Sequence, residues 1–330
     1  MRRALTDFKT IRALDLFSGA GGSSYGARLA GVSVVAAIDS WPLVEHVYKD
    51  NFPDAVFYRS KCENISPTRV MQEIGKIDLI IASPECTSHT CAKGNGDRSE
   101  DSKQTAFQVC RFASALQPRW IIVENVVQMR GWSKYTRWLN RLERLGYMHR
   151  EQVLDSADFG VPQSRKRLFI VCDRVQEPPQ IVPAARLIRS AATVIVPNGA
   201  YDFAPLRTER RALRTLQSAG RAINEIGRNQ SFLVVYYGSD GGGGWQSLDV
   251  PLRTVTTLDR FALVKPTKGG HQMRMLQVPE LRKAMGFPSS FKLAHGTRRD
   301  QIKMLGNGVC PPVMRAIVRA LTRNGGNGGT

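Results

Sequence analysis

The sequence predicts an α/β fold in which a doubly wound, mostly parallel sheet forms one large domain and a smaller domain follows it. Short, continuous apolar runs alternate with helical patterns through the first half of the chain. This alternation is typical of a parallel sheet that is covered by helices on both faces. It stops at the proline-rich stretch 177–183, which cannot continue a helix or a central strand. We therefore expect the second domain to begin there.

The apolar runs and helical patterns place the individual elements. We expect strands at 13–17, 34–38, 77–82, 120–123 and 168–172, and helices at 43–51, 104–116 and 135–145. Beyond the boundary we expect a strand at 232–237, and a helix whose inward positions are Leu213, Leu216, Ile223 and Ile226. The glycine-rich tail 324–330 is expected to be disordered.

Composition narrows the classes of protein and partner. None of the 330 residues falls in an apolar stretch of the roughly 18 residues that a membrane span requires, and the segment 1–10 lacks a signal-peptide core. Six scattered cysteines in a chain of this size indicate free thiols, so we expect a cytoplasmic protein. The net charge of +19 favours nucleic acid as the partner, over a basic surface without a polyanionic partner and over an anionic membrane surface.

The basic residues between 181 and 230 are all arginine. For any one of these arginines, a solvated helix face and a face that contacts DNA are equally compatible with the sequence. The segment therefore indicates a nucleic-acid surface only together with other evidence.

The first strand ends in Asp15-Leu-Phe-Ser-Gly-Ala-Gly-Gly22, which places glycines where a backbone can approach a cofactor closely. Asp39 ends the second strand, twenty positions after Gly19, where a carboxylate can accept hydrogen bonds from a ribose. Together they indicate a cofactor that contains adenosine. The glycine spacing favours a sulfonium cofactor over a dinucleotide, and a tight turn without a ligand is the remaining alternative.

Two reactive side chains follow later strands. Cys86 lies just past the strand at 77–82, at the sheet edge where open α/β folds bind their ligands, and is a candidate nucleophile. An idle cysteine, or a metal site with His89 and Cys91, is the alternative, but no second cluster at zinc spacing supports a metal. Glu124 ends another strand, where burial would raise its pKa and make it a proton donor; a carboxylate that caps a helix or pairs with an arginine is the alternative.

Five ordered motifs make the chain resemble the cytosine-C5 DNA methyltransferases. The motifs are Asp15 to Gly22, Pro84-Glu-Cys86, Glu124-Asn-Val126, Gln163-Ser-Arg-Lys-Arg167 and Leu305-Gly-Asn-Gly-Val309. Pro251 to Thr256 and Glu280 to Pro288 are similar to late motifs of that family. The resemblance implies a Rossmann-like S-adenosylmethionine methyltransferase domain at 1–177, a target-recognition domain at 178–271, and a segment at 272–330 that returns to the catalytic domain.

The resemblance also implies a role for each matched residue. Cys86 would attack C6 of a cytosine flipped out of double-stranded DNA, while protonated Glu124 hydrogen-bonds ring N3. Arg165 and Arg167 would hold the base and its backbone, and Asn125 would orient the loop. The residues implied for binding S-adenosylmethionine are Phe17, Ser18, Gly19, Gly21, Gly22, Asp39, Ser40, Trp41, Asn64, Ser83, Pro84, Asn307 and Val309.

Two positions depart from the family pattern. Glu85 stands between Pro84 and the nucleophile, where the family has proline directly before cysteine, and Ser40 stands where an aromatic residue follows the ribose ligand. The alternatives within the resemblance are a tRNA cytosine-C5 methyltransferase and a catalytically silent DNA-binding relative. A cognate restriction endonuclease that acts on the same site is a further possible partner.

Overall fold

The computed structural model of the chain describes residues 10–84, 100–183, 188–196, 199–237 and 244–323. The chain divides into two compact units. The first unit comprises Met1–Leu154, Lys166–Val182 and Val313–Thr330, and the second comprises Asp155–Arg165 and Pro183–Pro312. The tail 324–330, for which we expected disorder, lies outside the described residues.

The first unit is built on a seven-stranded sheet in the order β3-β2-β1-β4-β5-β7-β6. The strands are β1 Arg12–Leu16, β2 Ser33–Asp39, β3 Val56–Arg59, β4 Leu79–Ala82, β5 Trp120–Asn125, β6 Met148–Asp155 and β7 Lys166–Asp173. The pairs β3-β2, β2-β1, β1-β4 and β4-β5 are parallel, whereas β5 and β7 are antiparallel. The predicted α/β fold with a mostly parallel sheet is confirmed.

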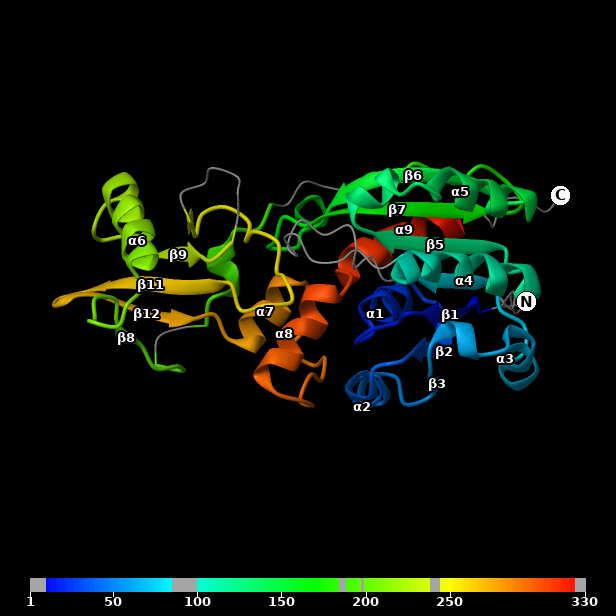
Figure 1. Ribbon diagram of the computed structural model, residues 1–330, viewed down its shortest axis with the longest axis horizontal. Helices are drawn as coiled ribbons and strands as arrows, with labels where there is room; N and C mark the ends of the chain where they lie inside the picture. The colour runs from blue at the N-terminus through cyan, green and yellow to red at the C-terminus, as the bar shows by residue number, and fades with distance from the viewer. Residues whose placement is uncertain (1–9, 85–99, 184–187, 197–198, 238–243, 324–330) are drawn as a thin grey trace, which may run out of the picture. The chain divides into compact units, whose positions relative to one another are not determined.

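Figure 1 shows helices on both faces of this sheet. They are α1 Gly22–Leu29, α2 Pro42–Asn51, α3 Pro67–Ile74, α4 Glu100–Leu116, α5 Tyr135–Arg144 and α9 Pro311–Arg323, with 3-10 turns η1 Cys62–Asn64 and η3 Val127–Gly131. The central strands β4 and β5 are buried along their whole length, so their apolar side chains form the core with the inner faces of the helices. Phe112 and Trp138 are fully buried members of that core.

The second unit contains a five-stranded antiparallel sheet in the order β10-β9-β11-β12-β8. Its strands are β8 Ala204–Pro205, β9 Phe232–Val235, β10 Trp245–Ser247, β11 Phe261–Thr267 and β12 Gly270–Met275. The helical segments are η4 Ser156–Phe159, η5 Ala191–Val194, α6 Leu213–Ile226, α7 Val278–Ala284 and α8 Arg298–Asn307.

Helix α6 packs on this sheet with three of its four predicted inward residues and with small residues beside them. Leu216, Ile223 and Ile226 are partly buried against the core cluster that includes Phe232, as predicted. Leu213 is 69% exposed, so its predicted inward position is wrong. It is the first residue of the helix, and the small residues Thr215, Ser218, Ala219 and Ala222 form the buried face. Small side chains allow a helix to approach a sheet closely, and apolar periodicity alone does not reveal this.

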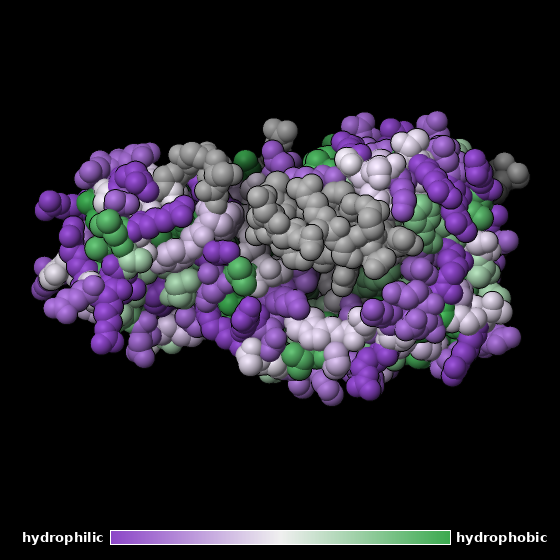
Figure 2. Space-filling view, in the orientation of Figure 1, coloured by the Kyte–Doolittle hydropathy of each residue, from purple (hydrophilic) through white to green (hydrophobic). Residues whose placement is uncertain are grey.

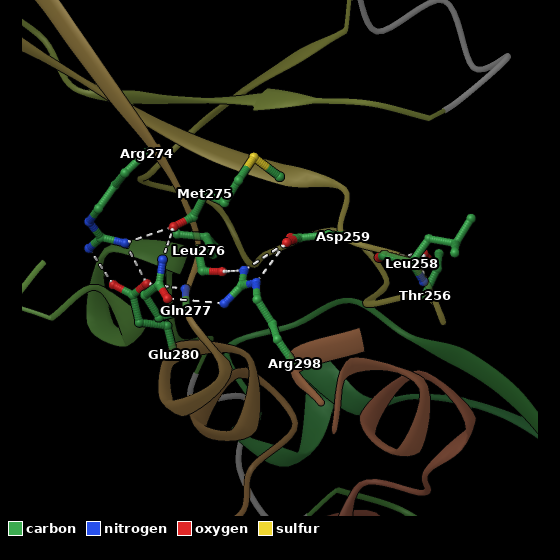
Figure 3. Close-up of polar contacts among 9 residues, drawn as sticks. All are labelled: Thr256, Leu258, Asp259, Arg274, Met275, Leu276, Gln277, Glu280 and Arg298. Carbon is green, nitrogen blue, oxygen red and sulfur yellow. Dashed lines mark hydrogen bonds and ion pairs between the residues drawn. The ribbon is translucent and has the colours of Figure 1, made fainter. Parts of the chain in front are cut away.

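Charged side chains connect the end of β12 to the helices that follow it (Figure 3). Arg274 forms a two-pronged ion pair with Glu280 of α7, and both side chains are almost fully buried. Arg298, at the start of α8, donates to Asp259 Oδ2 at 2.7 Å and to Gln277 Oε1 at 3.0 Å. The short helices α7 and α8 are therefore fixed by side-chain hydrogen bonds at their N-termini, in addition to a capping box in each.

The surface is mostly hydrophilic on the face drawn in Figure 2, where apolar residues form separate small areas. Within the described ranges, no helix has the length and apolar character needed to cross a bilayer.

Candidate active site

The turn from β1 into α1 carries the first predicted cofactor residues. Phe17 and Gly19 have left-handed φ values of 58° and 50°, and Gly21 has a φ of 89°. For a phenylalanine this conformation costs about 1–3 kcal/mol, so the surrounding structure must enforce it. A Cβ on Gly21 would collide with the ring of Phe52, whereas a Cβ on Gly19 would meet no heavy atom within 4 Å. The turn is packed on one side and open at Gly19, as close approach of a ligand requires.

Asp39, the last residue of β2, holds this turn. Its Oδ2 accepts a hydrogen bond from Gly19 N at 2.9 Å, and its Oδ1 accepts one from Trp41 N at 2.9 Å. Burial raises the pKa of Asp39, and the backbone donors oppose that shift. Each carboxylate oxygen has two lone pairs, so the side chain can also accept hydrogen bonds from ribose hydroxyls. The geometry fits a cofactor that contains adenosine.

The other predicted residues of this cluster are joined to it through the backbone. Ser18 N donates to Ile38 O at 3.2 Å, and Gly21 N donates to Ser18 O at 3.0 Å. Gly22 is the first residue of α1, and the exposed Ser40 lies between Asp39 and Trp41. The structure thus brings together the residues from Phe17 to Gly22 and from Asp39 to Trp41.

Asn64 lies in the 3-10 turn η1, which follows β3 at the same edge of the sheet. Ser60 N donates to Asp39 O at 3.0 Å, and the Cys62 thiol interacts with the backbone of Phe17, so η1 is adjacent to the glycine turn. Burial raises the pKa of the Cys62 thiol, which makes this cysteine structural. Asn64 itself is exposed.

A buried polar network beneath the glycine turn was missed by the sequence analysis. Asp15 Oδ2 accepts a hydrogen bond from Ser24 Oγ at 2.6 Å, and Ser24 Oγ lies 2.6 Å from Tyr48 Oη. Asp15 is fully buried, and this burial raises its pKa to about 7. A carboxyl group in an apolar strand was the available signal, since buried carboxyl groups are uncommon without partners.

Two further predicted residues follow β4. Ser83 N donates to Leu16 O at 3.2 Å, and Pro84 O accepts a hydrogen bond from Asn125 Nδ2 at 3.1 Å. Asn125 is buried, and its Oδ1 accepts from Val126 N at 2.8 Å. Asn125 therefore holds the backbone that leads out of β4. Glu85, Cys86, His89 and Cys91 lie outside the described residues.

Glu124 and Arg167 come together at the ends of β5 and β7. Arg167 Nε lies 3.2 Å from Glu124 Oε1, and the two side chains are 18% and 7% exposed. The sequence left burial of Glu124 and its pairing with an arginine as alternatives, and the structure shows both. Some planar heterocycles have an edge on which a ring nitrogen accepts a hydrogen bond and a neighbouring amino group donates one. A carboxyl group beside a guanidinium at the edge of a sheet can bind such an edge.

Arg165 occupies a different environment, in the second unit. It is 3% exposed, and its guanidinium donates to Val255 O at 2.9 Å, to Gly306 O at 2.7 Å and to Gly308 O at 3.0 Å. Both Nη atoms are thereby engaged by backbone carbonyls that lie about ninety or more positions away in the sequence.

Gln163 and Gly306 complete this arrangement. Gln163 Nε2 donates to Ala284 O at 3.1 Å, and its Oε1 accepts from Val255 N at 2.7 Å. A Cβ on Gly306 would lie closer than 3.0 Å to the backbone of Thr256, so only glycine fits there. Asn307, which is exposed, and Val309, which is buried, follow in the same segment. The late motifs of the sequence are therefore joined by hydrogen bonds within the second unit.

Among the residues that the structure describes, no three His, Cys, Asp or Glu side chains are grouped so that they could hold a metal ion. The four described cysteines, Cys62, Cys110, Cys172 and Cys310, are buried free thiols.

Comparison with known proteins identifies relatives over nearly the whole chain. The family model described as C-5 cytosine-specific DNA methylase matches residues 11–323. The type II methyltransferase M.HgiDI of Herpetosiphon aurantiacus is 28% identical over 308 residues, which cover 91% of this chain and 90% of that protein.

A further sequence relative is named as a tRNA-modifying enzyme, and a solved structure shares the fold. The human tRNA (cytosine(38)-C(5))-methyltransferase is 29% identical over 174 residues, which cover 51% of this chain and 44% of that protein. The structure of a DNMT2 mutant from Spodoptera frugiperda matches with a TM-score of 0.71 at 18% identity, and the match covers 95% of this chain and all of that one.

Proposed function

The chain belongs to the C-5 cytosine-specific DNA methylase family, and on this premise we propose that it methylates C5 of cytosine in double-stranded DNA. The family uses S-adenosylmethionine. The observation that carries the proposal is the buried Glu124–Arg167 pair beside the Asn125–Pro84 hydrogen bond, at the carboxyl edge of the sheet.

The substrate chemistry explains why these residues are needed. Cytosine C5 is a weak nucleophile while the ring is aromatic, so the enzyme must first add a nucleophile at C6. We assign that role to Cys86, which follows Pro84 in the sequence. As negative charge develops on the ring, Glu124 donates a hydrogen bond to N3 and stabilises the adduct. C5 of this adduct would take the methyl group that S-adenosylmethionine supplies, with S-adenosylhomocysteine as the leaving product. Loss of the C5 proton and departure of the Cys86 thiolate then restore the aromatic ring.

The two arginines of the Gln163–Arg167 motif take separate roles. Arg167 lies beside Glu124, so it can donate a hydrogen bond to the carbonyl oxygen of the base while Glu124 donates one to N3. The Nη atoms of Arg165 bind backbone carbonyls, and we therefore assign the base contact to Arg167 and a supporting role to Arg165.

The cofactor supplies an electrophilic methyl group. Gly19 and Asp39 would hold its adenosine, since the turn is open at Gly19 and Asp39 can accept from the ribose. The further residues proposed to bind it are Phe17, Ser18, Gly21, Gly22, Ser40, Trp41, Asn64, Ser83, Pro84, Asn307 and Val309.

The coverage of the comparisons favours duplex DNA over tRNA as the substrate, and the basic charge fits a nucleic acid of either kind. The net charge is +19, and Arg207 and Arg210, which precede α6, and Arg214, its second residue, are exposed within the proposed target-recognition region 178–271. Arginine suits both phosphates and guanine edges in a groove. The match to the type II DNA methyltransferase covers 91% of the chain, whereas the match to the tRNA enzyme covers 51%. The target base would be flipped out of the duplex, because C6 is otherwise stacked.

The name of the Herpetosiphon relative also suggests a biological setting. Type II methyltransferases act beside a restriction endonuclease of the same specificity, and we propose such a partner here. Protection of methylated plasmid from a panel of endonucleases would identify the shared site.

The test is base-resolution cytosine sequencing of plasmid DNA and of total tRNA from a methylation-deficient bacterium that expresses the protein. We expect C5 methylation in one short DNA sequence, its loss with Cys86→Ala, and its retention with Cys110→Ala, a buried cysteine of α4. Methylation of tRNA alone would assign the chain to the RNA-modifying branch of the family. Methylation of neither, by a folded protein that binds the cofactor, would indicate a silent relative.

A further inference from the structure

Arg111 of α4 binds the turn that carries Asn64, although no sequence motif singled it out. Its Nη2 donates to Cys62 O and to Ile65 O, the latter at 2.9 Å, and its Nε donates to Gln108 Oε1 at 2.7 Å. The two carbonyls lie on either side of the pair Glu63–Asn64. One guanidinium thus closes the short loop from which Asn64 extends.

The backbone of this turn has few other hydrogen bonds to hold it. Asn64 N donates to Lys61 O at 3.0 Å, and Ile65 N donates to Cys62 O at a weak 3.4 Å. A 3-10 turn of three residues is intrinsically short of hydrogen bonds at both ends. Hydrogen bonds from a charged donor are stronger than those between neutral groups, so Arg111 is the main restraint on the turn among the described contacts.

The second unit contains the same arrangement at the other predicted cofactor asparagine. Arg165 donates to Gly306 O and Gly308 O, the two carbonyls that flank Asn307. Asn64 and Asn307 are both exposed; Asn64 ends the 3-10 turn η1 and Asn307 ends helix α8, and in each case one arginine binds nearby backbone carbonyls on both sides. The same solution therefore occurs twice, on segments that share no sequence pattern.

We propose that Arg111 is a positioning residue of the cofactor site, which acts by fixing the turn that presents Asn64, and that Arg165 does the same for Asn307. This inference rests on the proposed cofactor role of the two asparagines. It does not depend on whether the substrate is DNA or tRNA, because binding of the cofactor can be measured without either nucleic acid.

The chain provides a matched control for Arg111. Arg12, at the start of β1, donates from Nε to Lys76 O at 3.1 Å and from Nη2 to Ile74 O. It is also partly buried, and it also binds two backbone carbonyls of a short segment, which here lie on either side of Gly75. Arg12 begins β1, whereas the glycine turn follows its last residue, so Arg12 lies at the opposite end of that strand. Loss of Arg12 reproduces the structural cost of losing Arg111 without touching the Asn64 turn.

The experiment measures the Kd of S-adenosylmethionine by calorimetry, together with the Tm, for Arg111→Met, Arg12→Met, Asn64→Ala and the double variant Arg111→Met/Asn64→Ala. Arg111→Met is expected to raise Kd roughly tenfold, which corresponds to about 1.4 kcal/mol. Arg12→Met is expected to lower the Tm similarly and to leave Kd within twofold of wild type. The double variant is expected to bind no more weakly than Asn64→Ala alone.

Two results would overturn the proposal. Equal weakening by Arg12→Met would mean that general destabilisation lowers the affinity. Additive losses in the double variant would mean that Arg111 does not act through Asn64. If Arg111→Met does not fold, Arg111→Lys replaces it, because lysine keeps the charge but cannot bind both carbonyls in the same fixed geometry. Arg165→Lys in the wild-type and Asn307→Ala backgrounds tests the second arginine by the same criterion.

Discussion

Replacing Arg274 by methionine should destabilise the second unit severely. Arg274 Nη1 and Nη2 donate to the two oxygens of Glu280 at 2.7 Å each, and the side chains are 4% and 0% exposed. Glu280 also accepts hydrogen bonds from Gln277 N at 2.7 Å and from Val196 N at 2.8 Å. Four donors thus converge on one buried carboxylate, and Arg274 supplies the only full positive charge among them.

The magnitude follows from that burial. Removing one partner of a buried ion pair leaves an uncompensated charge and typically costs about 3–5 kcal/mol. At roughly 2–4 °C per kcal/mol for a unit of this size, the Tm of Arg274→Met should fall by about 6–20 °C. Arg274→Met/Glu280→Gln removes both charges and keeps an acceptor for the two backbone donors. The double variant should therefore be more stable than Arg274→Met alone.

Urea unfolding monitored by tryptophan fluorescence gives the free energies for wild type, both single variants and the double variant. Arg130→Met is the control, because Arg130 pairs with Glu151 at 3.0 Å while 44% exposed. An exposed pair of this kind is worth at most about 1 kcal/mol. A loss for Arg274→Met no larger than that of the control, or a double variant that loses the sum of the two singles, would refute the reasoning.

The remaining predictions concern three single substitutions. Gly306→Ala should lower stability by about 1–3 kcal/mol or more in urea unfolding, because the added Cβ would lie closer than 3.0 Å to the backbone of Thr256. Asp15→Asn should remove a pH dependence: the wild-type carboxyl, with its pKa raised to about 7, makes the fold less stable as pH rises from about 4 to about 7. Glu124→Gln should lower the methylation rate by roughly 10²–10⁴-fold, by removing the proton that Glu124 supplies, with little change in cofactor Kd.

A different result for each of these three variants would contradict its prediction. Gly306→Ala with wild-type stability would mean that the Thr256 backbone moves aside, and Gly131→Ala, where a Cβ meets nothing within 4 Å, is its control. If wild type and Asp15→Asn show parallel stability curves from pH 4 to pH 8, Asp15 does not titrate in that window. Wild-type turnover by Glu124→Gln in a radiolabelled methyl-transfer assay would remove Glu124 from the mechanism.

The inner strands of the first unit's sheet were predictable from the sequence because the central ones are buried on both faces, whereas the edge strands β3 and β6, which are only partly buried, were not predicted. The runs that contain Ile80 and Ile122 are apolar without alternation, which distinguishes strands covered by helices from those with one wet face. The reversal of β7 was not predictable, because apolar runs carry no information on strand direction. Leu213 was misplaced for a related reason, since periodicity marks apolar positions at a helix end even where nothing covers them.

The candidate site divides in the same way. Motifs located the glycine turn, Asp39, Glu124 and Arg167, because local chemistry and sequence order suffice to find them. They could not show that Arg165 binds carbonyls at Val255 and Gly306, which lie 90 and 141 positions away. Such contacts depend on how distant segments fold together, and no local pattern records them.

The central claim is tested most directly by incubating the purified protein with S-adenosylmethionine labelled on the methyl group, with plasmid DNA and total tRNA in parallel reactions. The digested nucleosides would then be analysed by mass spectrometry. We predict labelled 5-methylcytosine in the DNA reaction, and none with Cys86→Ala. Label in the tRNA reaction alone, or undiminished label in DNA with Cys86→Ala, would contradict the account.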